Sequence, residues 1–86
     1  MDVVLRGEAA GRLLKDDTAM SALGEVEREC FETWAATNPA DTDTREFQYR
    51  MLKAVELLQD KLETWVQQGD HVRITAEQAK REASIL

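Results

Sequence analysis

The side chains with the most reactive chemistry in the sequence are its one cysteine and its one histidine, Cys30 and His71. A thiolate beside an imidazole can act as a nucleophile, and both groups bind zinc. A zinc site needs about four ligands at recognisable spacing, and that pattern is absent. No motif brings Cys30 and His71 together, and Cys30 falls on the core face of a predicted helix. We therefore predict a buried apolar role for Cys30 and an exposed turn position for His71.

Glu27 is the carboxylate in the most unusual sequence environment. It lies in the middle of the apolar stripe of a predicted helix over residues 18–36. A buried carboxylate has a raised pKa and can mark a functional site. The alternative is an ion pair with a cation of the facing helix, for which Lys61 is the candidate. We favour the structural interpretation, because ion-pair networks also perturb pKa values.

Asp41, Asp43 and Glu46 form an acidic turn that suggests a calcium site. An EF-hand loop needs oxygen ligands at fixed positions and a glycine at its sixth position, and the chain has no such loop. Helix capping accounts for these residues without a metal. The chain also lacks a phosphate-binding glycine loop and a catalytic triad signature. We therefore expect a non-enzyme with no catalytic residues, no metal site and no cofactor.

A long helix over residues 45–68 is the strongest element in the pattern. Apolar side chains recur along it at spacings of four, three, four and three residues, namely Met51, Val55, Leu58, Leu62 and Trp65. This spacing is typical of a helix that packs along another helix. Phe47, Ala54 and Val66 widen this stripe. Gly69 follows at the position of a left-handed C-terminal cap, so the helix is expected to end there.

A second helix is predicted over residues 18–36, opened by the capping carboxylates Asp16 and Asp17. Gly24 lies at the border of its apolar stripe and would allow another helix to approach closely. The stripe is formed by Met20, Leu23, Val26, Cys30, Phe31 and Trp34.

The segment between the two helices predicts a tight reversal. Asn38 resembles a cap, Pro39 a first helical residue and Asp41 an acidic third position, enough for a single turn. Asp43 and Glu46 form a capping box for the long helix. A connection this short predicts an antiparallel hairpin over residues 18–68.

The two ends of the chain are less regular. Residues 3–5 are too few to distinguish a strand from a helix, and residues 8–15 favour a short helix. After Gly69, alternation over residues 70–74 suggests a short extended segment, and a capping box at Thr75 and Gln78 opens a last helix over residues 76–84. The predicted fold class is all-α, an antiparallel helical hairpin flanked by shorter terminal helices. We expect one small domain over residues 1–86, with a less certain N-terminal segment (1–16) and C-terminal tail (70–86).

Composition narrows the class of partner. The chain has 86 residues and a net charge of −6, with no cluster of Lys and Arg, so direct nucleic-acid binding is not expected. No stretch approaches the roughly 20 apolar residues that cross a bilayer, and the N-terminus lacks the pattern of a signal peptide. A core this small is marginal alone, which favours a protein partner or self-association.

A candidate interface lies on the long helix, away from its predicted stripe. Tyr49 and Leu57 give this side apolar area, and Arg50 and Lys53 lie with them, so a partner helix would fit there. Trp34 and Trp65 occupy core positions and are expected to fill the interior of the hairpin. The C-terminal residues Ile85 and Leu86 are further candidate partner contacts.

Residues 13–68 resemble small helical proteins of unknown function encoded by tailed bacteriophages and prophages. The likeness rests on LLKDD upstream, a Trp that ends one helix, a Thr/Pro/Asp-rich turn and an Arg-Glu-x-x-Tyr segment, here Trp34, Thr37, Asp41, Thr42, Arg45, Glu46 and Tyr49. Genes of this group lie among head and packaging genes, which implies a virion or assembly role.

The expected function is therefore a non-enzymatic virion structural or head-assembly protein, located in the virion or the host cytoplasm. Its expected partners are capsid, portal or neck proteins or further copies of itself, and it is expected to be multi-copy or homo-oligomeric. The alternative is a phage-encoded regulator or inhibitor that binds a host protein through its acidic surface.

Overall fold

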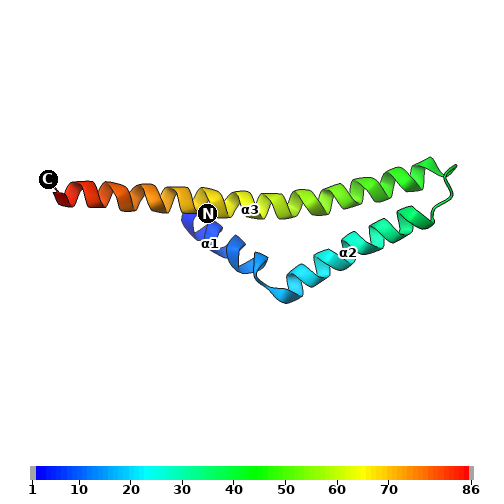
Figure 1. The fold of residues 1–86 in the computed structure, drawn as a ribbon, viewed down its shortest axis with the longest axis horizontal. Helices are drawn as coiled ribbons and strands as arrows, with labels where there is room; N and C mark the ends of the chain where they lie inside the picture. Colours follow the sequence, from blue (N-terminus) through cyan, green and yellow to red (C-terminus); the bar gives the residue numbers. More distant parts are fainter. Residues whose placement is uncertain (1, 86) are drawn as a thin grey trace. The chain divides into compact units, whose positions relative to one another are not determined.

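The computed structural model describes residues 2–85, in which α-helices joined by short turns are the only regular secondary structure (Figure 1). The helices are α1 (Val3–Leu14), α2 (Asp17–Ala36) and α3 (Thr42–Ile85). The predicted all-α class is therefore confirmed. The chain divides into two compact units. Unit 1 contains α1 and α3 from Lys61 onward, and unit 2 spans Asp16–Asp60, which contains α2 and the beginning of α3.

Aspartates begin the first two helices. The Asp2 side chain accepts a hydrogen bond from the Leu5 backbone N–H (3.0 Å), and Asp16 accepts one from that of Ala19 (2.8 Å). Each carboxylate thus satisfies an N–H that has no partner within its helix. The predicted start of α2 is confirmed. The helix α1 begins at Val3, so residues 3–5 are helical and the predicted start at residue 8 was too late.

The turn between α2 and α3 is held by local hydrogen bonds. The Asn38 side chain accepts from the Ala40 backbone N–H (2.8 Å), and the Asp41 N–H donates to the Asn38 carbonyl (2.8 Å). Asp41 then caps α3, because its carboxylate accepts from the Thr44 N–H (3.1 Å). The predicted capping box at Asp43 was therefore placed two residues too late, and Asp43 lies inside the first turn of α3.

Gly69 does not end the long helix. The helix α3 continues to Ile85, so the predicted extended segment over residues 70–74 and the separate last helix were wrong. No glycine among the described residues has a positive φ, and Gly69 is no left-handed cap. A Cβ at Gly69 would lie 3.1 Å from the Val3 carbonyl oxygen and 3.2 Å from the Gly7 Cα. Glycine is needed there because α1 crosses α3 with backbone against backbone.

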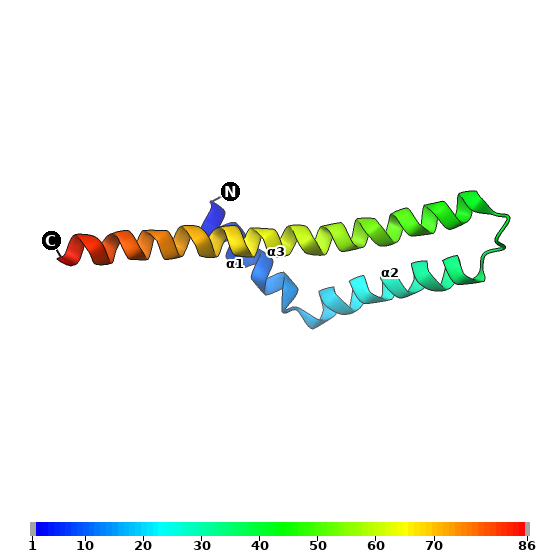
Figure 2. The same cartoon turned by 45° about the horizontal axis from the view of Figure 1, so that its top comes forward.

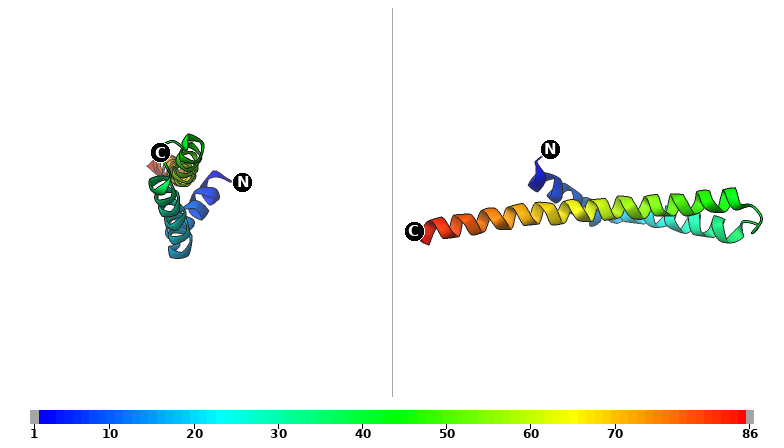
Figure 3. Two further views of the ribbon diagram at one scale, coloured as in Figure 1. Left: turned by 90° about the vertical axis from the view of Figure 1, so that its right-hand side faces the viewer. Right: turned by 90° about the horizontal axis from the view of Figure 1, so that it is seen from above.

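The rest of unit 1 packs around this crossing, which is visible in Figure 3. Ala10 of α1 is buried. The Arg6 guanidinium carbon lies 4.7 Å from the centroid of the Trp65 ring, and Arg6 donates a hydrogen bond to the Gln68 side chain (2.9 Å). Trp65 was predicted to fill the hairpin, whereas it belongs to unit 1 and lies against α1.

In unit 2, α2 and the first part of α3 run in opposite directions from the turn that joins them (Figures 1 and 2). Cys30 of α2 and Val55 of α3 are buried, as predicted. Met51 and Leu58 were predicted to be buried with Val55, but they are 38% and 50% exposed. Leu52 and Gln59, which lie one turn before and one turn after Val55, are partly buried instead. The buried stripe is thus rotated away from Met51 and Leu58.

Gln59 occupies this stripe because it has a polar partner there. Its side-chain amide donates a hydrogen bond to a carboxylate oxygen of Glu27 (3.1 Å). Glu27 therefore lies within the interface between α2 and α3, as its sequence position predicted. Its partner across the interface is Gln59, and the predicted pair with Lys61 is not formed. A paired polar contact inside a small interface fixes the register of the two helices.

Candidate functional site

Aromatic side chains gather near the turn end of unit 2. Phe31 and Trp34 come from the last turns of α2, and their ring centroids are 6.0 Å apart with the planes tilted by 32°. Tyr49 comes from the second turn of α3. The end of α2 lies beside the beginning of α3 (Figure 1). All of these rings line one hollow.

This hollow is an apolar pocket of about 260 Å³. Its walls are Phe31, Trp34, Tyr49 and the side chains between them, the full set being Cys30, Phe31, Trp34, Gln48, Tyr49 and Leu52. Cys30 is a free thiol and is buried. We refer to this hollow as the aromatic pocket. Its volume and its apolar walls suit the insertion of one apolar side chain from another protein.

Cations lie over two of the aromatic rings. The Arg45 guanidinium carbon is 4.7 Å from the Trp34 ring centroid, and the Lys53 ammonium is 5.5 Å from that of Tyr49. A cation over a ring face is attracted by the ring quadrupole, which restrains both side chains. A hydrogen bond from Lys53 to Glu56 (3.1 Å) raises the pKa of Lys53 above its ordinary value. The rim of the pocket is therefore held in place by charged neighbours.

The predicted partner-binding residues of α3 are exposed. Tyr49 and Leu57 are among the exposed large hydrophobic residues, and Tyr49 also lines the aromatic pocket. Arg50 pairs with Glu46 (3.2 Å) and Lys53 with Glu56 (3.1 Å). These charges are thus satisfied within α3. Ile85 is exposed at the end of α3, and Leu86 lies outside the described residues.

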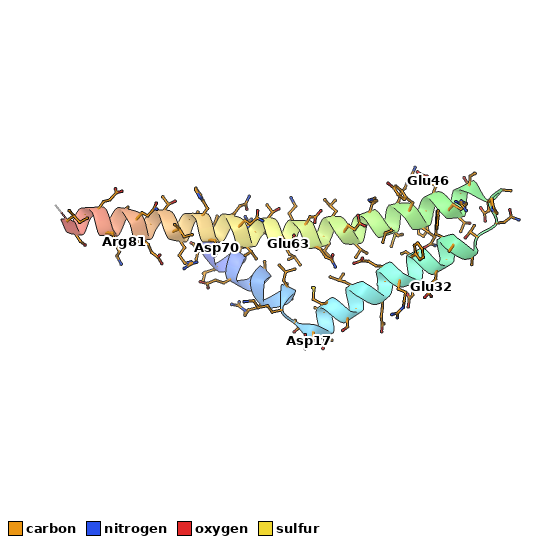
Figure 4. The ribbon with its side chains drawn as sticks, viewed as in Figure 1. Asp17, Glu32, Glu46, Glu63, Asp70 and Arg81 are labelled. Atoms are coloured by element: carbon orange, nitrogen blue, oxygen red, sulfur yellow. The ribbon has the colours of Figure 1, made fainter. Side chains whose placement is uncertain are left out.

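Exposed acidic side chains lie on both helices of unit 2. Glu32 of α2 and Glu46 of α3 point away from one another in Figure 4, and both are exposed. Asp41 is also exposed, and its hydrogen bonds from Thr44 hold the pKa of its carboxyl below the ordinary value. In residues 2–85, no three side chains of the metal-binding types are grouped so that they could hold an ion. Within this acidic turn, Asp41 caps α3.

The sequence pattern singled out Tyr49 as a candidate contact but did not indicate the pocket that Tyr49 lines. Trp34 was expected in the interior, whereas its side chain is partly exposed and forms a pocket wall. Phe31 was assigned to the core and is exposed. The available signal was the position of Phe31 at the edge of the apolar stripe, next to buried Cys30. His71 is exposed as predicted, but it lies within α3 and not in a turn.

Comparisons with family models, with curated proteins and with solved structures find no match for the chain. Within the described residues, no helix is both long enough and apolar enough to cross a membrane.

Proposed function

We propose that the chain is a non-enzymatic phage structural or head-assembly protein that binds other proteins through the aromatic pocket. The observation that carries this proposal is the exposure of aromatic side chains around an apolar pocket on paired helices. Aromatic residues in a small apolar hollow are typical of the centre of protein interfaces. The rim cations are already paired or stacked, so recognition relies on apolar insertion.

The viral part of the proposal is supported by the resemblance of residues 13–68 to small phage proteins. The protein-binding part is supported independently by the scarcity of buried apolar side chains. Among the described residues, the buried hydrophobic ones are Ala10, Cys30, Val55 and Leu62. A protein with so little core gains stability when a partner covers its remaining apolar surface.

Mass spectrometry of purified virions from the encoding phage tests this function. We expect the chain at a fixed copy number relative to the major capsid protein. Tyr49→Ala opens one wall of the aromatic pocket and should reduce incorporation severalfold, whereas Tyr49→Phe keeps the ring and should incorporate normally.

Absence of the chain from virions would contradict a structural role and favour a transient assembly factor or a regulator that binds a host protein. Equal incorporation of Tyr49→Ala and wild type would exclude the aromatic pocket as the binding site. Far-UV circular dichroism of both variants provides the control for folding, because Tyr49 is exposed and its truncation should leave helix content unchanged.

A further inference from the structure

A second exposed apolar stripe runs along α3, next to the stripe that faces α2. It consists of Phe47, Met51, Ala54 and Leu58, spaced by four, three and four residues, and all are exposed. This is the spacing of a helix seam that packs against another helix. We call these residues the outer stripe. None of these four side chains is charged.

The outer stripe is separate from the aromatic pocket. Tyr49 and Met51 are two positions apart, which separates them by about 160° around a helix. Tyr49 and Phe31 line one flank of the α2–α3 interface, so the outer stripe lies on the other flank. Val26, at the edge of the α2 stripe opposite Phe31, is also exposed on that flank. A partner on the outer stripe would leave the pocket open.

Charges of opposite sign stand at the two ends of the outer stripe. Asp43 precedes Phe47 by four residues, and Lys61 follows Leu58 by three. They are about five helical turns apart and share one side of α3. Both are exposed, and neither belongs to an ion pair within the described part of the chain. A stripe with an anion at one end and a cation at the other is complementary to itself when reversed.

We propose that the outer stripe is a self-association face. A second copy lies antiparallel on it, with Phe47 of each copy beside Leu58 of the other and Asp43 of each copy beside Lys61 of the other. The contact is isologous, the commonest arrangement in homo-oligomers. It goes beyond the proposed function because it uses neither Tyr49 nor the aromatic pocket.

Sedimentation equilibrium over a dilution series tests this contact. The wild-type chain should form dimers. Leu58→Glu places an unpaired carboxylate in the seam and should raise the dimer dissociation constant by roughly a hundredfold. Ile74→Glu is the matched control, because Ile74 is also a large apolar residue of α3 and is 46% exposed, but it lies outside the outer stripe. It should leave the dimer intact.

A charge-exchange series tests the antiparallel register. Lys61→Asp alone and Asp43→Lys alone should each weaken the dimer by about threefold. The double variant restores opposite charges at both ends and should recover most of the wild-type affinity. Helix content is measured for each variant, because Asp43 also complements the first turn of α3.

A wild-type chain that is monomeric throughout the series would overturn this proposal, and so would a dimer unaffected by Leu58→Glu. A double charge variant weaker than both single variants would overturn the antiparallel register. These results are independent of virion incorporation and of Tyr49→Ala, so failure of the self-association face and failure of the aromatic pocket are distinguishable.

Discussion

At the scale of single residues, the glycines of the three helices have opposite requirements. A Cβ at Gly7 would lie 2.7 Å from the Trp65 carbonyl oxygen and 3.1 Å from the Gly69 Cα. Both neighbours are backbone atoms, so the crossing of α1 and α3 would have to open. Gly24, in contrast, has no heavy atom other than its neighbours in the α2 backbone within 4 Å of the site where its Cβ would be. Its expected role in close helix approach was wrong, and it only weakens α2.

Gly24→Ala should therefore raise the free energy of unfolding by about 0.5–1 kcal/mol, since alanine loses less backbone entropy in a helix. Gly7→Ala should lower it by about 1–3 kcal/mol through overpacking. Urea denaturation followed by circular dichroism measures both. Gly11→Ala is an intermediate control, because its Cβ would meet only the Val66 side chain, at 3.8 Å. Destabilisation by Gly24→Ala would contradict an open environment at that position.

Asp41 gives the start of α3 a defined pH dependence. Its hydrogen bonds from Thr44 lower the pKa of its carboxyl in the folded state. A lowered pKa contributes stability that is fully present above the unfolded-state pKa, about 3.9, and is lost as the pH falls through the folded-state value. The midpoint of thermal unfolding should thus be higher for wild type than for Asp41→Ala at neutral pH, and this difference should shrink below about pH 4.

The control is Asp41→Asn, which keeps an oxygen that accepts the Thr44 N–H but does not titrate near pH 4. The difference between Asp41→Asn and Asp41→Ala should stay constant over the same pH range. A constant difference between wild type and Asp41→Ala would show that the ionised carboxylate does not stabilise the cap.

At the scale of elements, periodicity predicted the helices better than their orientation. Val55, Leu62 and Gly69 are buried in α3 at intervals of seven residues, and Val55 and Leu62 belonged to the predicted stripe. However, Val55 and Leu62 fit two possible stripes, one with Met51 and Leu58 and the other with Leu52 and Gln59. Hydrophobicity favours the stripe that contains Met51 and Leu58. The stripe that faces α2 contains Gln59, which is polar and was not assigned to the core. The hydrogen bond with Glu27 satisfies the Gln59 amide in this position, and hydrophobic periodicity does not register such a contact.

The length of α3 was unpredictable for a related reason. Gly69 has the local signature of a helix end, and nothing near it in sequence indicates otherwise. Glycine is required at position 69 because of Gly7, which is far away in the sequence. The Gly7 Cα would lie 3.2 Å from a Cβ at Gly69. The aromatic pocket is likewise non-local, because it needs the end of α2 beside the start of α3. The exposure of a single residue such as Tyr49 can be predicted from sequence, but the hollow between two helices cannot.

At the scale of the whole molecule, the main feature is how few apolar side chains are buried. Among the described residues, thirteen large hydrophobic residues are exposed. No side chain in residues 2–85 is less than 2% exposed. Burial of apolar area is the dominant favourable term in folding, at about 25 cal/mol per Å². A chain that buries so little on its own is marginally stable, so much of its stability should come from association.

The midpoint of thermal unfolding should therefore depend on protein concentration. If a dimer dissociates as its chains unfold, a tenfold rise in concentration adds about 1.4 kcal/mol per dimer by mass action, or about 0.7 kcal/mol per chain. For a chain of this size, that corresponds to a rise of roughly 3–5 °C. Scanning calorimetry of wild type and Ile74→Glu should show this rise, whereas Leu58→Glu should melt lower and at a midpoint independent of concentration. A concentration-independent wild type would mean that the helices are stable without a second copy, and the exposed apolar residues would then have to be explained by the aromatic pocket and its partner alone.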